Sequence, residues 1–197
     1  MMVRFLLPGC GEVACDKRKY ATAFLLQSRE QDAVRGKRLL QPHEKGFVLC
    51  NPPAAPLTTA ELDAVYALPF TRQPHPATNG HVPAIEEVSF SITSARGCFG
   101  NCNFCALTFH QGRTVTARSH QSILEEAERL AREPDFKGYI HDVGGPTANF
   151  RHPSCQKQLK SGVCAEKECL GFSACRNLDA SEADYTALLK ELRRVPG

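Results

Sequence analysis

No apolar run in the 197-residue sequence approaches the roughly 20 residues that a membrane-spanning helix requires. The first seven residues include one arginine and only a short apolar stretch before Pro8, which is too little for an export signal. An excess of one charge is also missing, because the net charge is +3 and basic residues are scattered among acidic ones. Charge alone therefore favours no nucleic-acid partner, and we expect a cytoplasmic protein without membrane association.

Cysteine, in contrast, is abundant, with ten residues in the chain. In a compartment that keeps thiols reduced, clustered cysteines indicate metal binding rather than disulfides. Seven of the ten fall into two clusters. We interpret the other three, Cys10, Cys15 and Cys50, as small, weakly polar packing residues and assign them no function.

The first cluster lies in the segment Gly-Cys-Phe-Gly-Asn-Cys-Asn-Phe-Cys, residues 97–105, directly after a predicted strand. Its thiols are those of Cys98, Cys102 and Cys105. Three thiolates on a four-iron cluster leave one iron open to an external ligand. A zinc site completed by His110 and a disulfide pair are the alternatives that the residues alone leave open.

Together with longer segments, this spacing resembles the signature of the radical S-adenosylmethionine superfamily. Within it, the stretches ARGCFGNCNFCALTFHQGR, SHQSILEEA, GYIHDVGGPTANF and NPPAAPLTTAELDAVYALPF resemble the YgiQ (UPF0313) family, over nearly the whole chain. The resemblance implies that Cys98, Cys102 and Cys105 hold a [4Fe-4S] cluster and that S-adenosyl-L-methionine binds the open iron. It further implies reductive cleavage to a 5′-deoxyadenosyl radical and an electron donor such as flavodoxin or ferredoxin. It indicates no particular substrate.

The resemblance also implies further cofactor contacts. Phe104, with Phe99, would shield the cluster, although ordinary core packing explains these rings equally well. The turn Gly144-Gly145-Pro146-Thr147 follows a predicted strand and would meet the amino group of S-adenosylmethionine. In the superfamily this turn usually ends in glutamate, and here Pro146 stands in that place. A plain tight turn is the alternative.

Several polar residues near these motifs are weaker candidates. Asp142 precedes the glycine turn and is either an acceptor for the cofactor or an exposed residue opposite Val143. His110, Arg113 and Arg118 follow the cysteine loop and would bind substrate or a carboxylate. Arginines in loops are more often solvated, so an exposed position is the simpler expectation.

The second cluster consists of Cys155, Cys164, Cys169 and Cys175 in a segment with little apolar periodicity. Four thiolates suit zinc or a closed auxiliary iron–sulfur cluster, since no metal position would stay open. Thiols that merely pack are the alternative.

Periodicity predicts an alternation of helices and strands. In the first half we expect helix from 16 to 40 with a break at 35–37, a buried strand at 46–50, and a helix that begins with a capping box of Thr58 and Glu61.

In the second half we expect strands at 87–93 and 138–143 around a helix that Ser119 begins. Its apolar stripe consists of Ile123, Leu124, Ala127, Leu130 and Ala131, and Glu125, Glu126, Glu128 and Arg129 form its polar side. A last helix would be capped by Ser181 with Asp184.

The expected fold class is α/β. Strand, helix and strand at this spacing predict a parallel βαβ unit. With the family resemblance, we expect the N-terminal part of a partial (β/α)6 radical SAM barrel, preceded by the tail of an α/β N-terminal domain. The division would place residues 1–83 in the first domain and 84–197 in the second, with a cysteine-rich insertion at 151–178. Two strand–helix units are too few for such a barrel, so we expect a fragment with little activity of its own.

The expected function is therefore that of a radical S-adenosylmethionine enzyme. The alternatives are a non-catalytic zinc- or iron–sulfur-binding module and an electron-transfer module whose cluster does not cleave S-adenosylmethionine.

Overall fold

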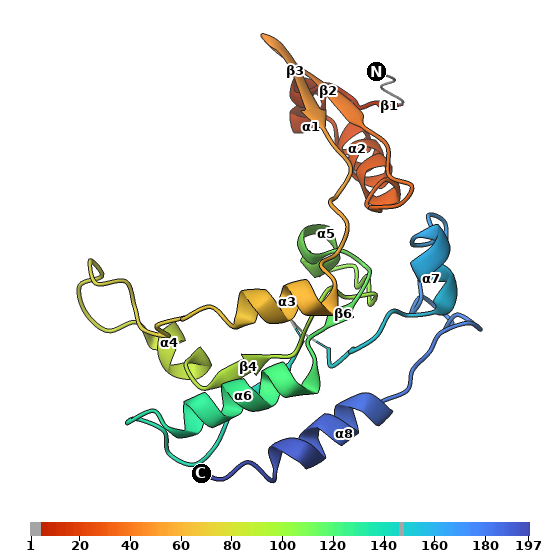
Figure 1. Ribbon diagram of the computed structural model, residues 1–197. Coiled ribbons are helices and arrows are strands. Elements are labelled where there is room, and N and C mark those ends of the chain that lie inside the picture. Colours follow the sequence, from red (N-terminus) through yellow and green to blue (C-terminus); the bar gives the residue numbers. More distant parts are fainter. Residues whose placement is uncertain (1–4, 146–147) are drawn as a thin grey trace. The chain divides into compact units, whose positions relative to one another are not determined.

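The structure is a computed structural model of the chain, and it describes residues 5–145 and 148–197. The chain forms two compact units, each described by itself. Unit 1 comprises residues 1–56, 99–114 and 153–179, and unit 2 comprises residues 57–98, 115–152 and 180–197. Each unit combines helices with short strands (Figure 1), which form one small sheet in unit 1 and two in unit 2 among the described residues. None of the helices in the described part of the chain has the length and hydropathy to cross a bilayer.

Unit 1 is built on a three-stranded sheet of β1 (Phe5–Leu6), β2 (Leu39–His43) and β3 (Gly46–Cys50). β2 lies in the middle, parallel to β1 and antiparallel to β3. The helices of this unit are α1 (Cys10–Cys15), α2 (Lys17–Arg29), α5 (Leu107–Gln111) and α7 (Gln156–Ser161). α2 begins close to the predicted start at residue 16, because the Asp16 side chain caps it by accepting hydrogen bonds from the backbone of Arg18 and Lys19.

Two expectations for this region are wrong. The helix ends at Arg29 and not near Leu40. Gly36, in the predicted break at 35–37, lies in a tight turn where an added Cβ would be 2.3 Å from the carbonyl oxygen of Asp32. Leu39 and Leu40 then belong to β2. The strand at 46–50 is confirmed, but it is exposed and not buried, since β3 is an edge of the sheet and Phe47 is 66% exposed.

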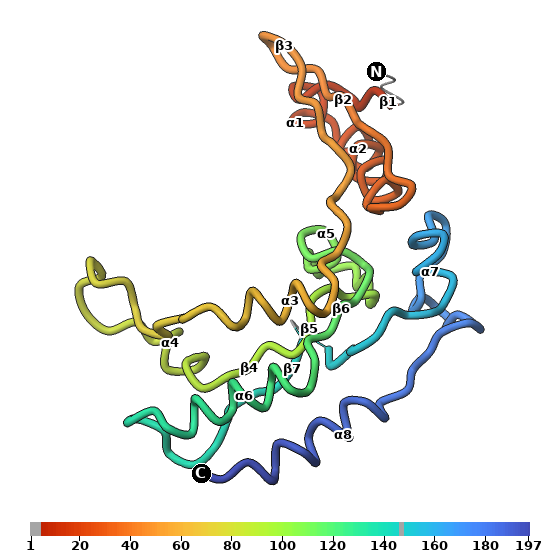
Figure 2. The backbone as a smooth tube through the Cα atoms, in the orientation of Figure 1, coloured from red at the N-terminus to blue at the C-terminus, as the bar shows by residue number. Residues whose placement is uncertain are grey.

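Unit 2 contains a short parallel βαβ unit. β4 (Ser91–Thr93) leads to β5 (Ala95–Arg96), and β5 pairs antiparallel with β6 (Thr116–Ala117). α6 (His120–Ala131) follows, and β7 (Asp142–Gly144) returns beside β4 in parallel register, with Ile92 opposite Val143. The chain path in Figure 2 shows β4 and β7 side by side. The parallel pairing is thereby confirmed, whereas the sheets of the described residues have two or three strands and form no barrel.

The strands are shorter than the sequence predicts, for local reasons. The first residues of the expected strand 87–93 belong instead to α4 (Pro83–Val88), which has proline at a helix start. Gly138 has a φ of 88°, a left-handed conformation that an extended strand does not use, so β7 begins only at Asp142.

The remaining helices begin largely as predicted. Thr58 and Glu61 form the expected capping box at the start of α3 (Thr59–Tyr66). The Ser119 hydroxyl accepts from the backbone N–H of Ser122 at the start of α6. α8 (Ala183–Leu192) differs, because its N-cap is Glu182 without a side-chain hydrogen bond.

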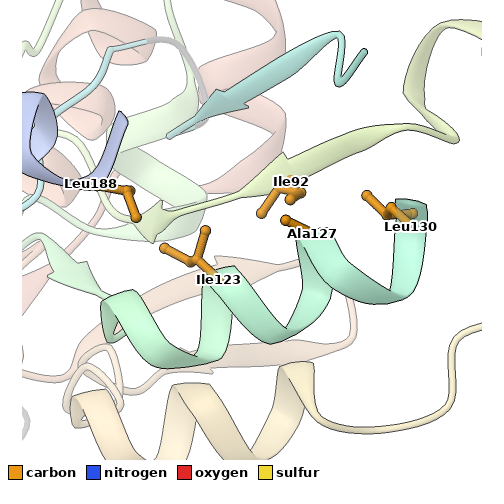
Figure 3. Packing of buried hydrophobic residues seen from close by; sticks show 5 residues of the cluster. All are labelled: Ile92, Ile123, Ala127, Leu130 and Leu188. Carbon is orange, nitrogen blue, oxygen red and sulfur yellow. The ribbon is translucent and has the colours of Figure 1, made fainter. Parts of the chain in front are cut away.

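The core of unit 2 lies between α6, β4 and α8. Figure 3 shows Ile123, Ala127 and Leu130 of α6 on the side of the helix that faces Ile92 of β4, with Leu188 of α8 nearby. These five side chains are at most 2% exposed. The apolar stripe of α6 is thereby confirmed at its centre, while Leu124 and Ala131 are only half-buried. Placing Glu126 on the solvated side was wrong, because this residue is 5% exposed.

We expect Ile123→Ala to lower the free energy of unfolding by about 2–5 kcal/mol, because it leaves a cavity at a fully buried position. Urea denaturation followed by circular dichroism measures the loss. Gln121→Ala, at an exposed position of the same helix, is the matched control and should change the stability by less than about 0.5 kcal/mol. Equal effects of the two substitutions would contradict the assignment of this core.

Candidate functional site

The cysteine loop begins directly after β5. Gly97 has a φ of 89°, which favours glycine and turns the chain out of the strand. Cys98 is 7% exposed and is the last residue of its stretch of unit 2. Cys102 is exposed and Cys105 half-buried, and both belong to unit 1.

Within unit 1, a tight turn connects Cys102 and Cys105. The backbone N–H of Cys105 donates to the carbonyl oxygen of Cys102 at 2.9 Å. Asn101, just before the turn, has a φ of 50°, a left-handed conformation that asparagine tolerates better than most residues. Its side chain donates to Glu168 at 2.8 Å and accepts from Thr108 at 3.4 Å. The loop conformation is therefore held by side-chain contacts that do not use the thiols.

The two phenylalanines of the loop differ sharply in burial. Phe99 is 1% exposed, whereas Phe104 is 93% exposed. Phe99 therefore packs as a core residue, and a shielding role for Phe104 stays a prediction.

The glycine turn follows β7. The carbonyl oxygen of Gly144 accepts from the backbone N–H of Ser94 at 2.7 Å, which ties this turn to the end of β4. A Cβ on Gly145 would lie 2.4 Å from the carbonyl oxygen of Ala148, so the backbone leaves no room for a side chain there. Asp142 is exposed. Pro146 and Thr147 lie outside the described residues.

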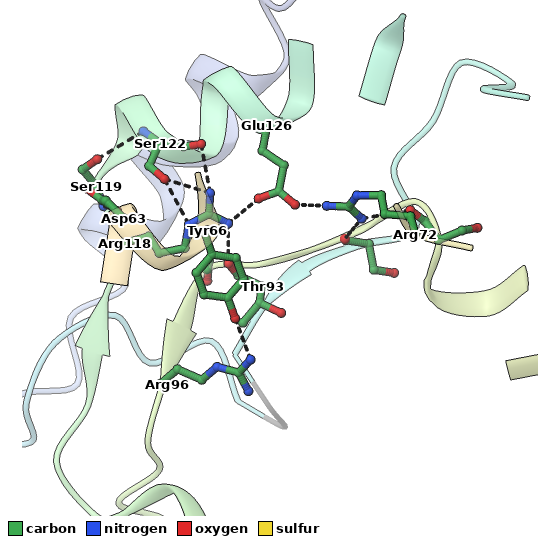
Figure 4. Close-up of polar contacts among 12 residues, drawn as sticks. Asp63, Tyr66, Arg72, Thr93, Arg96, Arg118, Ser119, Ser122 and Glu126 are labelled. Atoms are coloured by element: carbon green, nitrogen blue, oxygen red, sulfur yellow. Dashed lines mark hydrogen bonds and ion pairs between the residues drawn. The ribbon is translucent and has the colours of Figure 1, made fainter. Parts of the chain in front are cut away.

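Arg118 is not a solvated loop residue, contrary to the simpler expectation. It is 1% exposed and donates to the carbonyl oxygen of Thr93 at 2.9 Å (Figure 4). Its guanidinium also binds Glu126 and lies 4.3 Å from the ring centroid of Tyr66. Burial lowers the pKa of Arg118 to about 10, so the side chain stays charged at neutral pH.

Glu126 joins Arg118 to a second arginine. The other oxygen of its carboxylate pairs with Arg72, whose guanidinium donates to the carbonyl oxygens of Ser89 at 2.9 Å and Ser91 at 3.1 Å. Desolvation lowers the pKa of Arg72 as well. Both guanidinium groups thus hold the backbone of β4, the strand that leads to the cysteine loop.

Arg151 completes the contacts around the end of β4. This 7%-exposed side chain donates to the carbonyl oxygens of Ser94 at 3.1 Å and Arg118 at 2.8 Å, and its Nε lies 2.5 Å from Asp184. Sequence reasoning missed the roles of Arg151, Glu126 and Arg72, because no local pattern signals contacts between residues 17 to 57 positions apart.

Arg113 is also buried and not solvated, with 9% exposure in unit 1. It donates to the carbonyl oxygen of Cys164 at 2.9 Å and to that of Lys167 at 3.1 Å. His110, at the end of α5, is exposed. Roles of these residues and of Arg118 toward substrate or a carboxylate stay predictions.

The second cysteine cluster lies wholly in unit 1. All four thiols are half-buried, and they line one cavity of about 110 Å³. Within residues 5–145 and 148–197, no three His, Cys, Asp or Glu side chains are already arranged as ligands of a metal ion.

Comparison with known proteins identifies the chain. Residues 2–91 match the family described as Radical SAM N-terminal, so the protein is of the class that carries this domain. It belongs to the UPF0313 family. It is 53% identical over 194 residues to a UPF0313 protein of Clostridium perfringens and 52% identical over 192 residues to one of Clostridium botulinum. These alignments cover 98% and 96% of this chain but 29% and 30% of the relatives, so the chain spans about 30% of their length.

We expect Glu126→Ala to lower the free energy of unfolding by about 3–5 kcal/mol, because it leaves the buried charge of Arg118 without its partner. Glu128→Ala is the control on the same helix, since Glu128 forms an exposed pair with Arg132 at 3.5 Å. Its loss should cost less than about 1 kcal/mol. Thermal and urea unfolding of both variants measure the difference, and a mild effect of Glu126→Ala would show that the network does not hold β4.

Proposed function

We propose that the chain contributes the cluster-binding part of a radical S-adenosylmethionine enzyme, with Cys98, Cys102 and Cys105 as the protein ligands of a [4Fe-4S] cluster. The observation that carries the proposal is the spacing of these thiols in the loop that follows β4 and β5, where β4 begins a parallel βαβ unit, in a chain of the UPF0313 family. The match to the Radical SAM N-terminal family ends at residue 91, shortly before the cysteines.

The donor set suits the cluster. Thiolates are the usual ligands of iron–sulfur clusters, and three of them within eight residues leave one iron for S-adenosylmethionine. When bound, the cluster and S-adenosylmethionine supply a 5′-deoxyadenosyl radical after reduction by a donor such as flavodoxin or ferredoxin.

The residues of this chain would bind the cluster and position S-adenosylmethionine beside it. Cys98 is nearly buried, which would keep water from its metal bond, and Cys102 presents its thiol on an exposed turn. The carbonyl oxygens of Gly144 and Gly145 are acceptors for the ammonium group of S-adenosylmethionine. The carbonyl of Gly144 already accepts from Ser94, which leaves one lone pair for the cofactor.

The arginine contacts around β4 hold the backbone that leads to Cys98, the first of the three cysteines. Thr93 ends β4 and Ser94 follows it, three residues before Gly97, and their carbonyl oxygens accept from Arg118 and Arg151. Such rigid support fixes where the loop begins, which a precisely positioned cofactor requires.

In the whole protein, we propose that β4, α6 and β7 form the first βαβ unit of a partial (β/α)6 barrel. The further strands and the residues that select a substrate would come from the part of the relatives that this chain does not span. The substrate and the reaction on it are therefore properties of the whole protein.

The test is anaerobic reconstitution of the chain with ferrous iron and sulfide. We expect about four irons per chain and a reduced-state electron paramagnetic resonance signal that changes when S-adenosylmethionine is added. Cys98→Ala, Cys102→Ala and Cys105→Ala should each abolish the signal. Cys10→Ala, Cys15→Ala and Cys50→Ala are matched controls at exposed cysteines and should retain it.

The same preparation separates the alternatives. A colourless protein that binds only zinc at Cys98, Cys102 and Cys105 would identify a non-catalytic module and overturn the proposal. A cluster that is reduced but yields no 5′-deoxyadenosine, in a full-length relative supplied with dithionite, would identify an electron-transfer module instead.

A further inference from the structure

The cysteines of the 151–178 segment converge on one place in unit 1. They come from three separate positions along the chain: Cys155 precedes α7, Cys164 follows it, and Cys169 and Cys175 lie further on. All four line the same cavity of about 110 Å³, and all four are half-buried free thiols. The four thiols therefore border one cavity, although no three of them already lie as ligands of one metal ion among the described residues.

A small hairpin places two of the cysteines at opposite backbone positions. The backbone N–H of Cys175 donates to the carbonyl oxygen of Cys169 at 3.0 Å, and Leu170 forms an antiparallel bridge with Ala174. Cys169 and Cys175 are therefore opposite each other at the open end of the hairpin. Paired positions of this kind bring two thiols within reach of one metal ion.

Cys155 is held by a separate set of hydrogen bonds. The neighbouring Ser154 donates through its backbone N–H and its hydroxyl to the side-chain oxygen of Gln158, at 3.0 and 3.2 Å. Gln158 in turn donates to the carbonyl oxygen of Arg113 at 2.9 Å. Both Ser154 and Gln158 are buried, so the start of α7 is fixed beside the cavity.

Arg113 connects these segments. Its carbonyl oxygen accepts a hydrogen bond from the side chain of Gln158, and its guanidinium donates to the carbonyl oxygens of Cys164 and Lys167. The Nε–H of the same guanidinium is buried and has no hydrogen-bond partner among the described residues, although the side chain lines the cavity. A buried N–H without an acceptor costs about 1–3 kcal/mol, so an acceptor in the cavity would relieve this cost.

Charge around the cavity points to an anionic occupant. Arg113, Lys157 and Lys167 line it, against one carboxylate, that of Glu168. Four thiolates around a divalent ion carry a net charge of about −2 and offer sulfur acceptors to N–H groups. Such a centre would satisfy both the cationic lining and the unpartnered Nε of Arg113.

We propose that Cys155, Cys164, Cys169 and Cys175 form a structural tetrathiolate zinc site, separate from the cluster ligands Cys98, Cys102 and Cys105. Zinc suits these residues, because structural zinc sites are closed by four ligands and take four cysteine thiolates. Zinc–sulfur bonds are about 2.3 Å long, so the four side chains turn into the cavity when the ion binds. Arg113 acts as a positioning residue that donates to the thiolate centre.

The test uses Co²⁺ as a spectroscopic probe of the reduced chain. We expect one equivalent of Co²⁺ to give the intense visible absorption and sulfur-to-metal charge transfer of a tetrahedral thiolate site, and Zn²⁺ to displace it. Cys155→Ser, Cys164→Ser, Cys169→Ser and Cys175→Ser should each weaken binding by at least about 100-fold. This exceeds the 10–100-fold cost of losing an outer contact. Arg113→Lys should weaken it by about 10-fold, because the lysine keeps the charge but lacks the Nε donor.

Two sets of controls make the result specific. Cys10→Ser, Cys15→Ser and Cys50→Ser remove exposed thiols of the same unit and should leave the cobalt spectrum unchanged. The triple variant Cys98→Ala, Cys102→Ala, Cys105→Ala should also retain it, so that failure of the radical S-adenosylmethionine proposal is distinguishable from failure of this one.

A measurement on the unmodified chain covers the case in which a cysteine variant does not fold. With zinc bound, iodoacetamide should leave Cys155, Cys164, Cys169 and Cys175 unlabelled while Cys10, Cys15 and Cys50 react, as mass spectrometry reads directly. Removal of zinc by a chelator should expose all four together. Three outcomes would overturn the assignment. They are labelling of these cysteines in the presence of zinc, disulfides between them that persist through purification in reductant, and iron and sulfide bound at these positions.

Discussion

The buried carboxylate of Glu126 is the contact on which unit 2 depends most. It pairs with two guanidinium groups, that of the buried Arg118 and that of the partly buried Arg72. Each arginine also donates to a carbonyl oxygen of β4, Arg72 to that of Ser91 and Arg118 to that of Thr93. A buried polar network stabilises a structure when its members are paired, and an unpaired member is costly. Loss of one member would therefore weaken the contacts that hold β4, the strand that leads to the cysteine loop.

In unit 1 as well, a buried arginine, Arg113, donates to backbone carbonyl oxygens. Arg113 donates to two backbone carbonyl oxygens of the cysteine-rich segment, much as Arg118 and Arg72 donate to those of β4. The difference lies in the unpartnered Nε of Arg113 and in the thiols that share its cavity. In both units a buried arginine therefore fixes irregular backbone next to cysteines, where short strands and helices supply little regular hydrogen bonding.

Sequence reasoning succeeded where the signal is local. The capping box at Thr58 and Glu61, the Ser119 cap and the stripe of Ile123, Ala127 and Leu130 all depend on residues within one or two helical turns. It failed where distant residues decide. Arg113 and Arg118 look like solvated loop arginines, and Glu126 looks like part of a polar helix face, until their partners from other segments are known. The buried strand expected at 46–50 is an exposed edge, because burial depends on what packs against β3 and not on its apolar residues.

By itself, the sequence determined the family, the spacing of the three cluster cysteines and the order of helices and strands along most of the chain, because these properties are carried by neighbouring residues. Only the tertiary structure decided that Cys155, Cys164, Cys169 and Cys175 line one cavity and that β4 is held by buried arginines. The irregular spacing of these four cysteines along the sequence does not predict that they line one cavity. Contacts between segments tens of residues apart are set by how the whole chain packs.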